Sequence, residues 1–77
     1  MDRFRPNVPH SQMLIEAAQE YGQKAAWCRH KAHDESMCEV WQKRQRILEM
    51  QNEPERGAIA NAYREAYQTE ASYYIGR

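Results

Sequence analysis

The fold of this chain is decided by residues 11–51, which read SQMLIEAAQEYGQKAAWCRHKAHDESMCEVWQKRQRILEMQ. In the first half, small and apolar residues recur at alternating steps of four and three, the spacing that places side chains on one face of a helix. This first seam consists of Leu14, Ala18, Tyr21, Ala25, Cys28 and Ala32. A second seam consists of Met37, Val40, Trp41, Ile47 and Leu48, and we expect it to form the bulkier part of the core. Each seam requires another helix to cover it.

The two seams are out of phase, which indicates a break or sharp bend near residues 34–36. Trp41 lies one position off the heptad step of the first seam, and one position is about 100° of rotation around a helix. Ser36 followed by Glu39 matches a capping box, which would start a new helix. One continuous helix over residues 11–51, about 60 Å long, is the alternative. We favour the break because of the capping signal.

A third helix is expected over residues 54–75. The preceding sequence NEPE at residues 52–55 supplies a capping asparagine and a proline in the first turn. Pro54 also prevents the preceding helix from continuing, and Gly76 is a plausible end. The apolar stripe of this helix consists of Ile59, Ala62, Tyr63, Ala66, Tyr67, Ala71 and Tyr74.

The predicted fold class is all-α, with two to three helices in a hairpin or small bundle that is completed by homodimerisation. A chain of 77 residues makes one domain and buries only roughly 60% of its unfolded surface, so association with a second copy would add burial. We expect an extended arm over residues 1–10 and one helical domain over 11–77, with helices at about 11–33, 37–51 and 54–75. The expected self-association residues are Leu14, Ala18, Tyr21, Ala25, Ile59, Tyr63, Tyr67 and Tyr74. Beside this seam, Gly22 predicts the close approach of another backbone.

The charge and hydropathy of the sequence argue against a DNA-binding protein that relies on charge alone and against a membrane-spanning protein. The formal net charge is zero, which argues against a purely electrostatic binder of DNA. No apolar run approaches the roughly 20 residues of a membrane span, and the first residues do not resemble a signal peptide. We therefore expect a cytoplasmic protein with reduced cysteines, without a membrane partner and without a cofactor.

The sequence contains no motif that predicts an enzyme: it has no Gly-rich phosphate loop and no His-Glu-x-x-His zinc motif. Cys28, His33 and Cys38 are the residues that could ligate zinc in a small zinc-binding module. Their spacing departs from that of structural zinc sites, so this is the weakest of three functional interpretations. The simpler interpretation is that Cys28 is a buried residue of the first seam and packs as a small hydrophobic side chain.

Trp27 is the residue that most strongly suggests a binding site. Its neighbours three and four positions away on a helix are all polar, so either another helix covers the ring or a partner does. The sequence therefore predicts a small non-catalytic protein-interaction module, which acts stoichiometrically as an adaptor, assembly factor or inhibitor of a larger protein. The expected partner-binding residues are Trp27, Lys24, His30 and Lys31.

A nucleic-acid-binding regulator is the alternative function. Residues 24–46 carry six basic and three acidic side chains, and a basic cluster can track a phosphate backbone. The residues that would make these contacts are Arg3, Arg5, Lys43, Arg44 and Arg46. The glutamates of the third helix suit phosphates poorly, so we place this function second.

Overall fold

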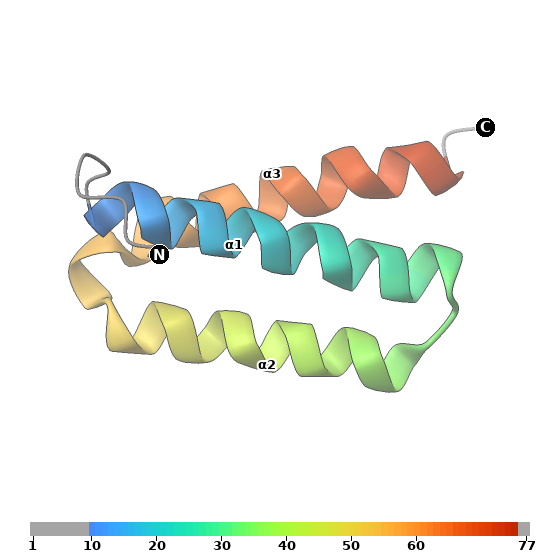
Figure 1. Ribbon diagram of the computed structural model, residues 1–77, viewed down its shortest axis with the longest axis horizontal. Helices are drawn as coiled ribbons and strands as arrows, with labels where there is room; N and C mark the ends of the chain where they lie inside the picture. Colours follow the sequence, from blue (N-terminus) through green and yellow to red (C-terminus); the bar gives the residue numbers. More distant parts are fainter. Residues whose placement is uncertain (1–9, 76–77) are drawn as a thin grey trace, which may run out of the picture.

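A computed structural model describes residues 10–75 of the chain as three helices packed side by side (Figure 1). Helix α1 spans His10–Ala26 and continues into a π-helical turn, η1, at Trp27–Lys31. Helix α2 spans Glu35–Gln51, and a 3₁₀ turn, η2, at Glu53–Glu55 leads into α3, which spans Arg56–Ile75. The fold is all-α, as predicted. The expected arm over residues 1–10 lies outside the described residues except for His10, which is helical, and so does Gly76.

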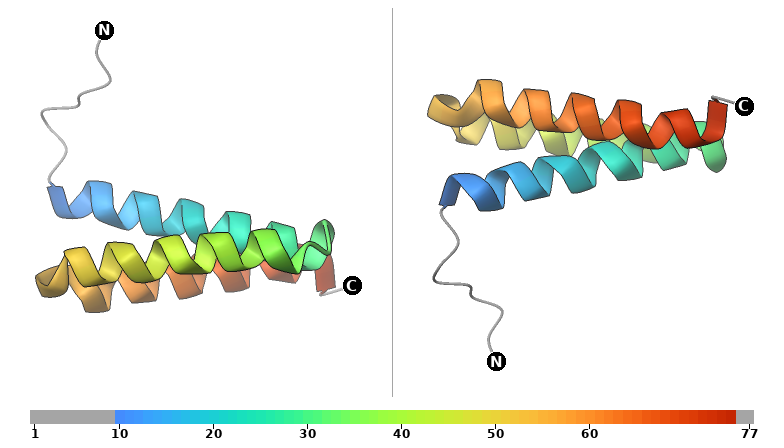
Figure 2. Two further views of the ribbon diagram at one scale, coloured as in Figure 1. Left: turned by 90° about the horizontal axis from the view of Figure 1, so that it is seen from below. Right: turned by 90° about the horizontal axis from the view of Figure 1, so that it is seen from above.

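The chain reverses direction twice, so α1 and α3 run parallel and α2 runs antiparallel to both (Figures 1 and 2). Helix α1 makes most of its contacts with α3 and fewer with α2, while α2 and α3 touch least. The first seam is therefore covered within the chain from Leu14 to Cys28, whereas Ala32, its last member, is exposed. Leu14, Ala18, Ile59 and Ala62 form one buried cluster, and Ala25, Cys28 and Cys38 form a second one.

The α1–α3 contact is close because small residues line it. Gly22 is buried, and a Cβ atom on it would lie 2.5 Å from the carbonyl oxygen of Tyr63 and 3.1 Å from the backbone nitrogen of Tyr67. Real Cβ atoms essentially never come that near, so only glycine allows the two backbones to meet here. This confirms that Gly22 marks the approach of a neighbouring helix.

The break between the seams is present, but it begins earlier than predicted. The π turn closes with a hydrogen bond of 2.9 Å from the Ala32 amide to the Trp27 carbonyl oxygen, and the Asp34 amide donates to the Cys28 carbonyl oxygen at 2.7 Å. Between Ala32 and Asp34, His33 adopts a left-handed conformation with φ of 56°. Helix α2 then starts with Asp34 as the N-cap, whose side chain accepts a hydrogen bond of 3.0 Å from the Met37 amide. The prediction that Ser36 caps this helix was wrong.

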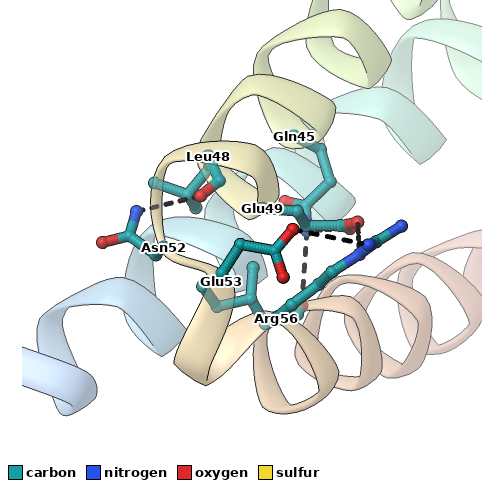
Figure 3. A network of polar contacts seen from close by, with 7 residues as sticks. Gln45, Leu48, Glu49, Asn52, Glu53 and Arg56 are labelled. Atoms are coloured by element: carbon teal, nitrogen blue, oxygen red, sulfur yellow. Dashed lines mark hydrogen bonds and ion pairs between the residues drawn. The ribbon is translucent and has the colours of Figure 1, made fainter.

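The second boundary is held by polar contacts around Asn52 (Figure 3). Asn52 ends α2 instead of capping α3. Its side-chain Nδ2 donates to the Leu48 carbonyl oxygen at 2.9 Å, and its backbone N–H donates to the Glu49 carbonyl oxygen at 3.3 Å. Arg56 lies 4.0 Å from a Glu49 carboxylate oxygen and 3.7 Å from one of Glu53. These contacts turn the chain through η2, with Pro54 in its first positions.

Helix α2 buries a different face from the one that the second seam predicted. Cys38 and Gln45 are buried, and Trp41 and Leu48 are half-buried beside them, so the core positions follow steps of three and four from Cys38. Met37, Val40 and Ile47 are exposed instead. The expectation that these three residues belong to the core was therefore wrong. Gln45 tolerates burial because its Nε2 donates to Glu49 at 2.9 Å and to the Ile59 carbonyl oxygen at 3.3 Å.

Candidate functional site: the exposed surfaces of α1 and α2

Trp27 is not fully covered by another helix, which is one of the two possibilities that its polar neighbours left open. It is the first residue of η1 and is 47% exposed. Lys31 is exposed one turn further on, and Lys24 is exposed one turn earlier. Lys24 lies 3.9 Å from a Glu20 carboxylate oxygen and also approaches the ring of Trp41, with its Nζ 5.5 Å from the ring centroid. The structure thus leaves the indole of Trp27 open to a partner.

His30 does not share this surface. Its ring is half-buried and meets that of Tyr67 edge to face, with the ring centroids 5.8 Å apart. Its Nε2 lies 3.2 Å from the Tyr67 hydroxyl oxygen, within hydrogen-bond distance. The expected group of four partner-binding residues is therefore divided: His30 turns toward α3, and the other three remain exposed on α1 and η1.

The residues expected to mediate self-association pack within one chain. Leu14, Ala18, Ala25 and Ile59 are buried, and Tyr21, Tyr63, Tyr67 and Tyr74 are half-buried. Tyr21 meets Trp41 at 5.8 Å between ring centroids, and Tyr63 stacks on Tyr67 at 6.2 Å. The partner that the first seam required is α3 of the same molecule.

The three possible zinc ligands are not brought together. Cys28 and Cys38 are free thiols in the same buried cluster, whereas His33 is exposed at the turn. Among residues 10–75, no group of three or more His, Cys, Asp or Glu side chains could hold a metal ion. Burial also raises the pKa of the Cys38 thiol, and a zinc ligand must be the thiolate.

A groove of about 480 Å³ lies between α2 and α3. Of its lining residues, Tyr63 is neutral and Arg29 is already ion-paired. Burial raises the pKa of Tyr63 to about 12, so its hydroxyl is protonated at neutral pH. Arg29 at the groove is 3.3 Å from a Glu35 carboxylate oxygen. Neither residue is an activated nucleophile or a general base, whose pKa would have to lie near the working pH. The groove is lined by Arg29, Gln42, Glu49, Ala60, Tyr63, Arg64, Tyr67 and Gln68.

The outer face of α2 is a further candidate site, whose apolar residues the sequence pattern assigned to the core. We define this face by Met37, Val40, Lys43, Arg44 and Ile47. Met37 is 43% exposed, Val40 is 41% exposed and Ile47 is 46% exposed. The residues that α2 buries, Cys38 and Gln45, lie on a different side of the helix. An apolar stripe on the side of a helix that faces away from its own core is typical of an interaction surface.

Two shallow hollows meet on this face. One has a volume of about 530 Å³ and is lined by Ser36, Glu39, Val40, Gln42, Lys43, Arg44, Arg46 and Ile47. The other, of about 200 Å³, lies at the α1–α2 boundary and is lined by Tyr21, Arg44, Ile47, Leu48 and Gln51. They share Arg44 and Ile47, so they form one continuous surface.

The basic residues expected to bind nucleic acid lie on or beside this surface. Lys43, Arg44 and Arg46 are all exposed on α2. The guanidinium carbon of Arg44 lies 5.0 Å from the centroid of the Trp41 ring, which is a cation–π contact. Arg3 and Arg5 lie outside the described residues.

Comparison of the chain with protein-family models, with curated proteins and with solved structures gave no match. In the part of the chain that the structure describes, none of the helices has the length and apolar character that crossing a membrane requires.

Proposed function

We propose that this protein is a small non-catalytic protein-interaction module, which acts stoichiometrically as an adaptor, assembly factor or inhibitor of a larger protein. One observation carries the proposal: the buried clusters of the bundle form within one chain, yet α2 keeps Val40 and Ile47 exposed away from its buried side and Met37 exposed one turn earlier. Burying such a stripe against a partner is worth about 25 cal/mol per Å² of apolar surface. Trp27 offers a second contact.

Homodimerisation through the first seam is not part of this proposal, because the seam is already buried against α3. A cytoplasmic location is part of it, since the two buried thiols are expected to stay reduced there.

The test is capture of proteins from a lysate of the source cell on the immobilised chain, compared with the double variant Val40→Asp/Ile47→Asp. We expect the unaltered chain to retain one protein, in an amount nearly equal to that of the immobilised chain. The variant should not retain this protein. The matched control, Tyr73→Asp/Ile75→Asp, replaces two large and more exposed residues of α3 with the same acidic residue and should retain the partner. Trp27→Ala measures the contribution of the second contact. Equal retention by all four proteins would refute the proposal.

Nucleic-acid binding is the second candidate, favoured by the exposure of Lys43, Arg44 and Arg46 on one helix. A phosphate backbone on this surface would also meet Val40, Ile47 and the carboxylate of Glu39, which line the same hollow. We therefore rank it below protein binding. Fluorescence anisotropy of labelled DNA and RNA at low and high salt tests it, because phosphate contacts weaken steeply as salt rises.

A further inference from the structure

We propose that the outer face of α2 binds an acidic amphipathic helix of the partner protein. This inference rests on the proposed interaction function and adds the chemistry of the partner. It combines three features of this face: the spacing of its apolar residues, the shape of the surface and the sign of its charge.

The apolar residues are spaced to meet another helix. Val40 and Ile47 are seven residues apart, about 10 Å along the helix axis, and point in nearly the same direction. Met37 is one turn before Val40. The two hollows that meet at Ile47 provide depressions on either side of this stripe. A partner helix that presents apolar side chains three, four and seven positions apart would fill them.

The charge of the surface selects an acidic partner. Lys43 and Arg44 lie between Val40 and Ile47 in the sequence and flank the stripe, and Arg46 lines the larger hollow. None of the three basic residues forms an ion pair with another side chain within residues 10–75. Of the described residues, Glu39 is the only acidic one that lines either hollow. Carboxylates on the partner would therefore find basic side chains without ion-pair partners at the rim of the apolar stripe.

The same charges disfavour a second copy of this chain on this face. A symmetric contact that sets Val40 of each copy against Ile47 of the other also sets Lys43 against Arg44 of the other copy, twice. Like charges placed directly opposite each other are destabilising, so the apolar gain would be opposed at the centre of the interface. An acidic helix on this face would place carboxylates against Lys43 and Arg44, so no like charges would face each other.

The experiment uses two synthetic helical peptides of about 18 residues that share the same leucine positions and differ only in their flanking residues. One carries glutamate and the other carries lysine. Binding to the full chain is measured by anisotropy of a label on the peptide, at about 50 and about 500 mM NaCl. We expect the glutamate peptide to bind at least about 10-fold more tightly at low salt, with the ratio falling at high salt because the charges are exposed and screened.

Three variants locate the site. Ile47→Asp should abolish binding of the glutamate peptide, Lys43→Glu/Arg44→Glu should reverse the preference to the lysine peptide, and Tyr73→Asp/Ile75→Asp should change nothing. Equal affinity for the two peptides, binding of neither, or insensitivity to Ile47→Asp would overturn the proposal. Tighter binding of double-stranded DNA than of the glutamate peptide would also overturn it, in favour of a phosphate partner.

Failure of this inference and failure of the proposed function are distinguishable. If neither peptide binds but Val40→Asp/Ile47→Asp still loses a protein from the lysate, the face is an interaction site and its partner is not an acidic helix. If the lysate shows no difference between the variants, the proposed function itself is refuted.

Discussion

Replacement of Gly22 by alanine tests the account of the α1–α3 interface most directly. The added Cβ would lie 2.5 Å from the carbonyl oxygen of Tyr63, 3.1 Å from the Tyr67 backbone nitrogen and 3.2 Å from the Ala66 Cβ. The two nearest atoms belong to the backbone of α3 and cannot rotate away. Ordinary van der Waals contact begins at 3.4 Å, so the two helices would have to separate by most of an ångström at this point.

The expected effect is a net loss of about 2 kcal/mol in the free energy of unfolding. Alanine gains about 1 kcal/mol over glycine from its helix propensity. Forcing an extra carbon into a well-packed interface costs typically about 1–3 kcal/mol, and the rigid backbone atoms place this site at or above the upper end of that range. Separation of the helices also loosens the contacts of Ala18 and Ala25, both fully buried. A loss of about 2 kcal/mol lowers the melting temperature of a domain of this size by roughly 8–16 °C.

The assay is urea unfolding followed by far-ultraviolet circular dichroism, with Gly57→Ala as the control. Gly57 also lies in a helix, but a Cβ there would meet nothing within 4 Å. Gly57→Ala should therefore raise the free energy of unfolding by up to about 1 kcal/mol from helix propensity alone. If Gly22→Ala were as stable as the unaltered chain, or were stabilised together with Gly57→Ala, the close α1–α3 contact would be refuted.

Three further predictions concern the turn and the core. Asp34→Ala should lower the free energy of unfolding by about 1 kcal/mol through loss of the N-cap, while Ser36→Ala should leave it unchanged; equal effects in urea unfolding would contradict the assignment of the cap. His33→Gly should raise it by about 1 kcal/mol because glycine adopts a left-handed φ without steric cost, whereas His33→Val should lower it, and the reverse order would be inconsistent with the turn. The pKa of Tyr63 is raised by burial to about 12 from its ordinary 10.0, so the folded state holds the proton more tightly than the unfolded state. The stability that this contributes is complete below about pH 10 and is lost as the pH rises toward about 12; urea midpoints measured across this range should fall less steeply for Tyr63→Phe, and parallel curves would argue against burial of the hydroxyl.

Features that depend on neighbouring residues in the chain were predictable from the sequence. Pro54 ends one helix and starts the next through its own geometry, and the alternating spacing from Leu14 to Cys28 is the spacing of the buried face of α1. Gly22 could be interpreted correctly because a glycine beside a seam of alanines leaves room for a second backbone and lowers helix propensity without any local benefit. For Trp27, the polar neighbours left open whether another helix covers the ring, and the structure leaves it 47% exposed.

Features that depend on how the helices meet were not predictable. The choice between Asp34 and Ser36 as N-cap is made by the π turn and the left-handed His33, which close on the Cys28 carbonyl oxygen. The buried face of α2 is set by the direction in which the chain leaves this turn. Gln45 therefore enters the core with its hydrogen-bond partners from Glu49 and Ile59, while Val40 and Ile47 face outward. Hydrophobicity alone ranks these residues in the opposite order. The sequence did not predict the candidate site on α2 because its pattern assigned Val40 and Ile47 to the core.

The pairing of α1 with α3 has a consequence for the order in which the protein folds during synthesis. The most extensive contact in the bundle joins α1 and α3, so α1 leaves the ribosome well before the surface that covers it exists. At about 5–20 residues per second, α1 waits for a few seconds with its alanine-rich side open to water. Among the described helices, the α1–α2 hairpin, with Cys28 against Cys38, is the only native pairing available in that interval. Folding is therefore expected to be completed in one late step, when α3 docks along α1 at Gly22.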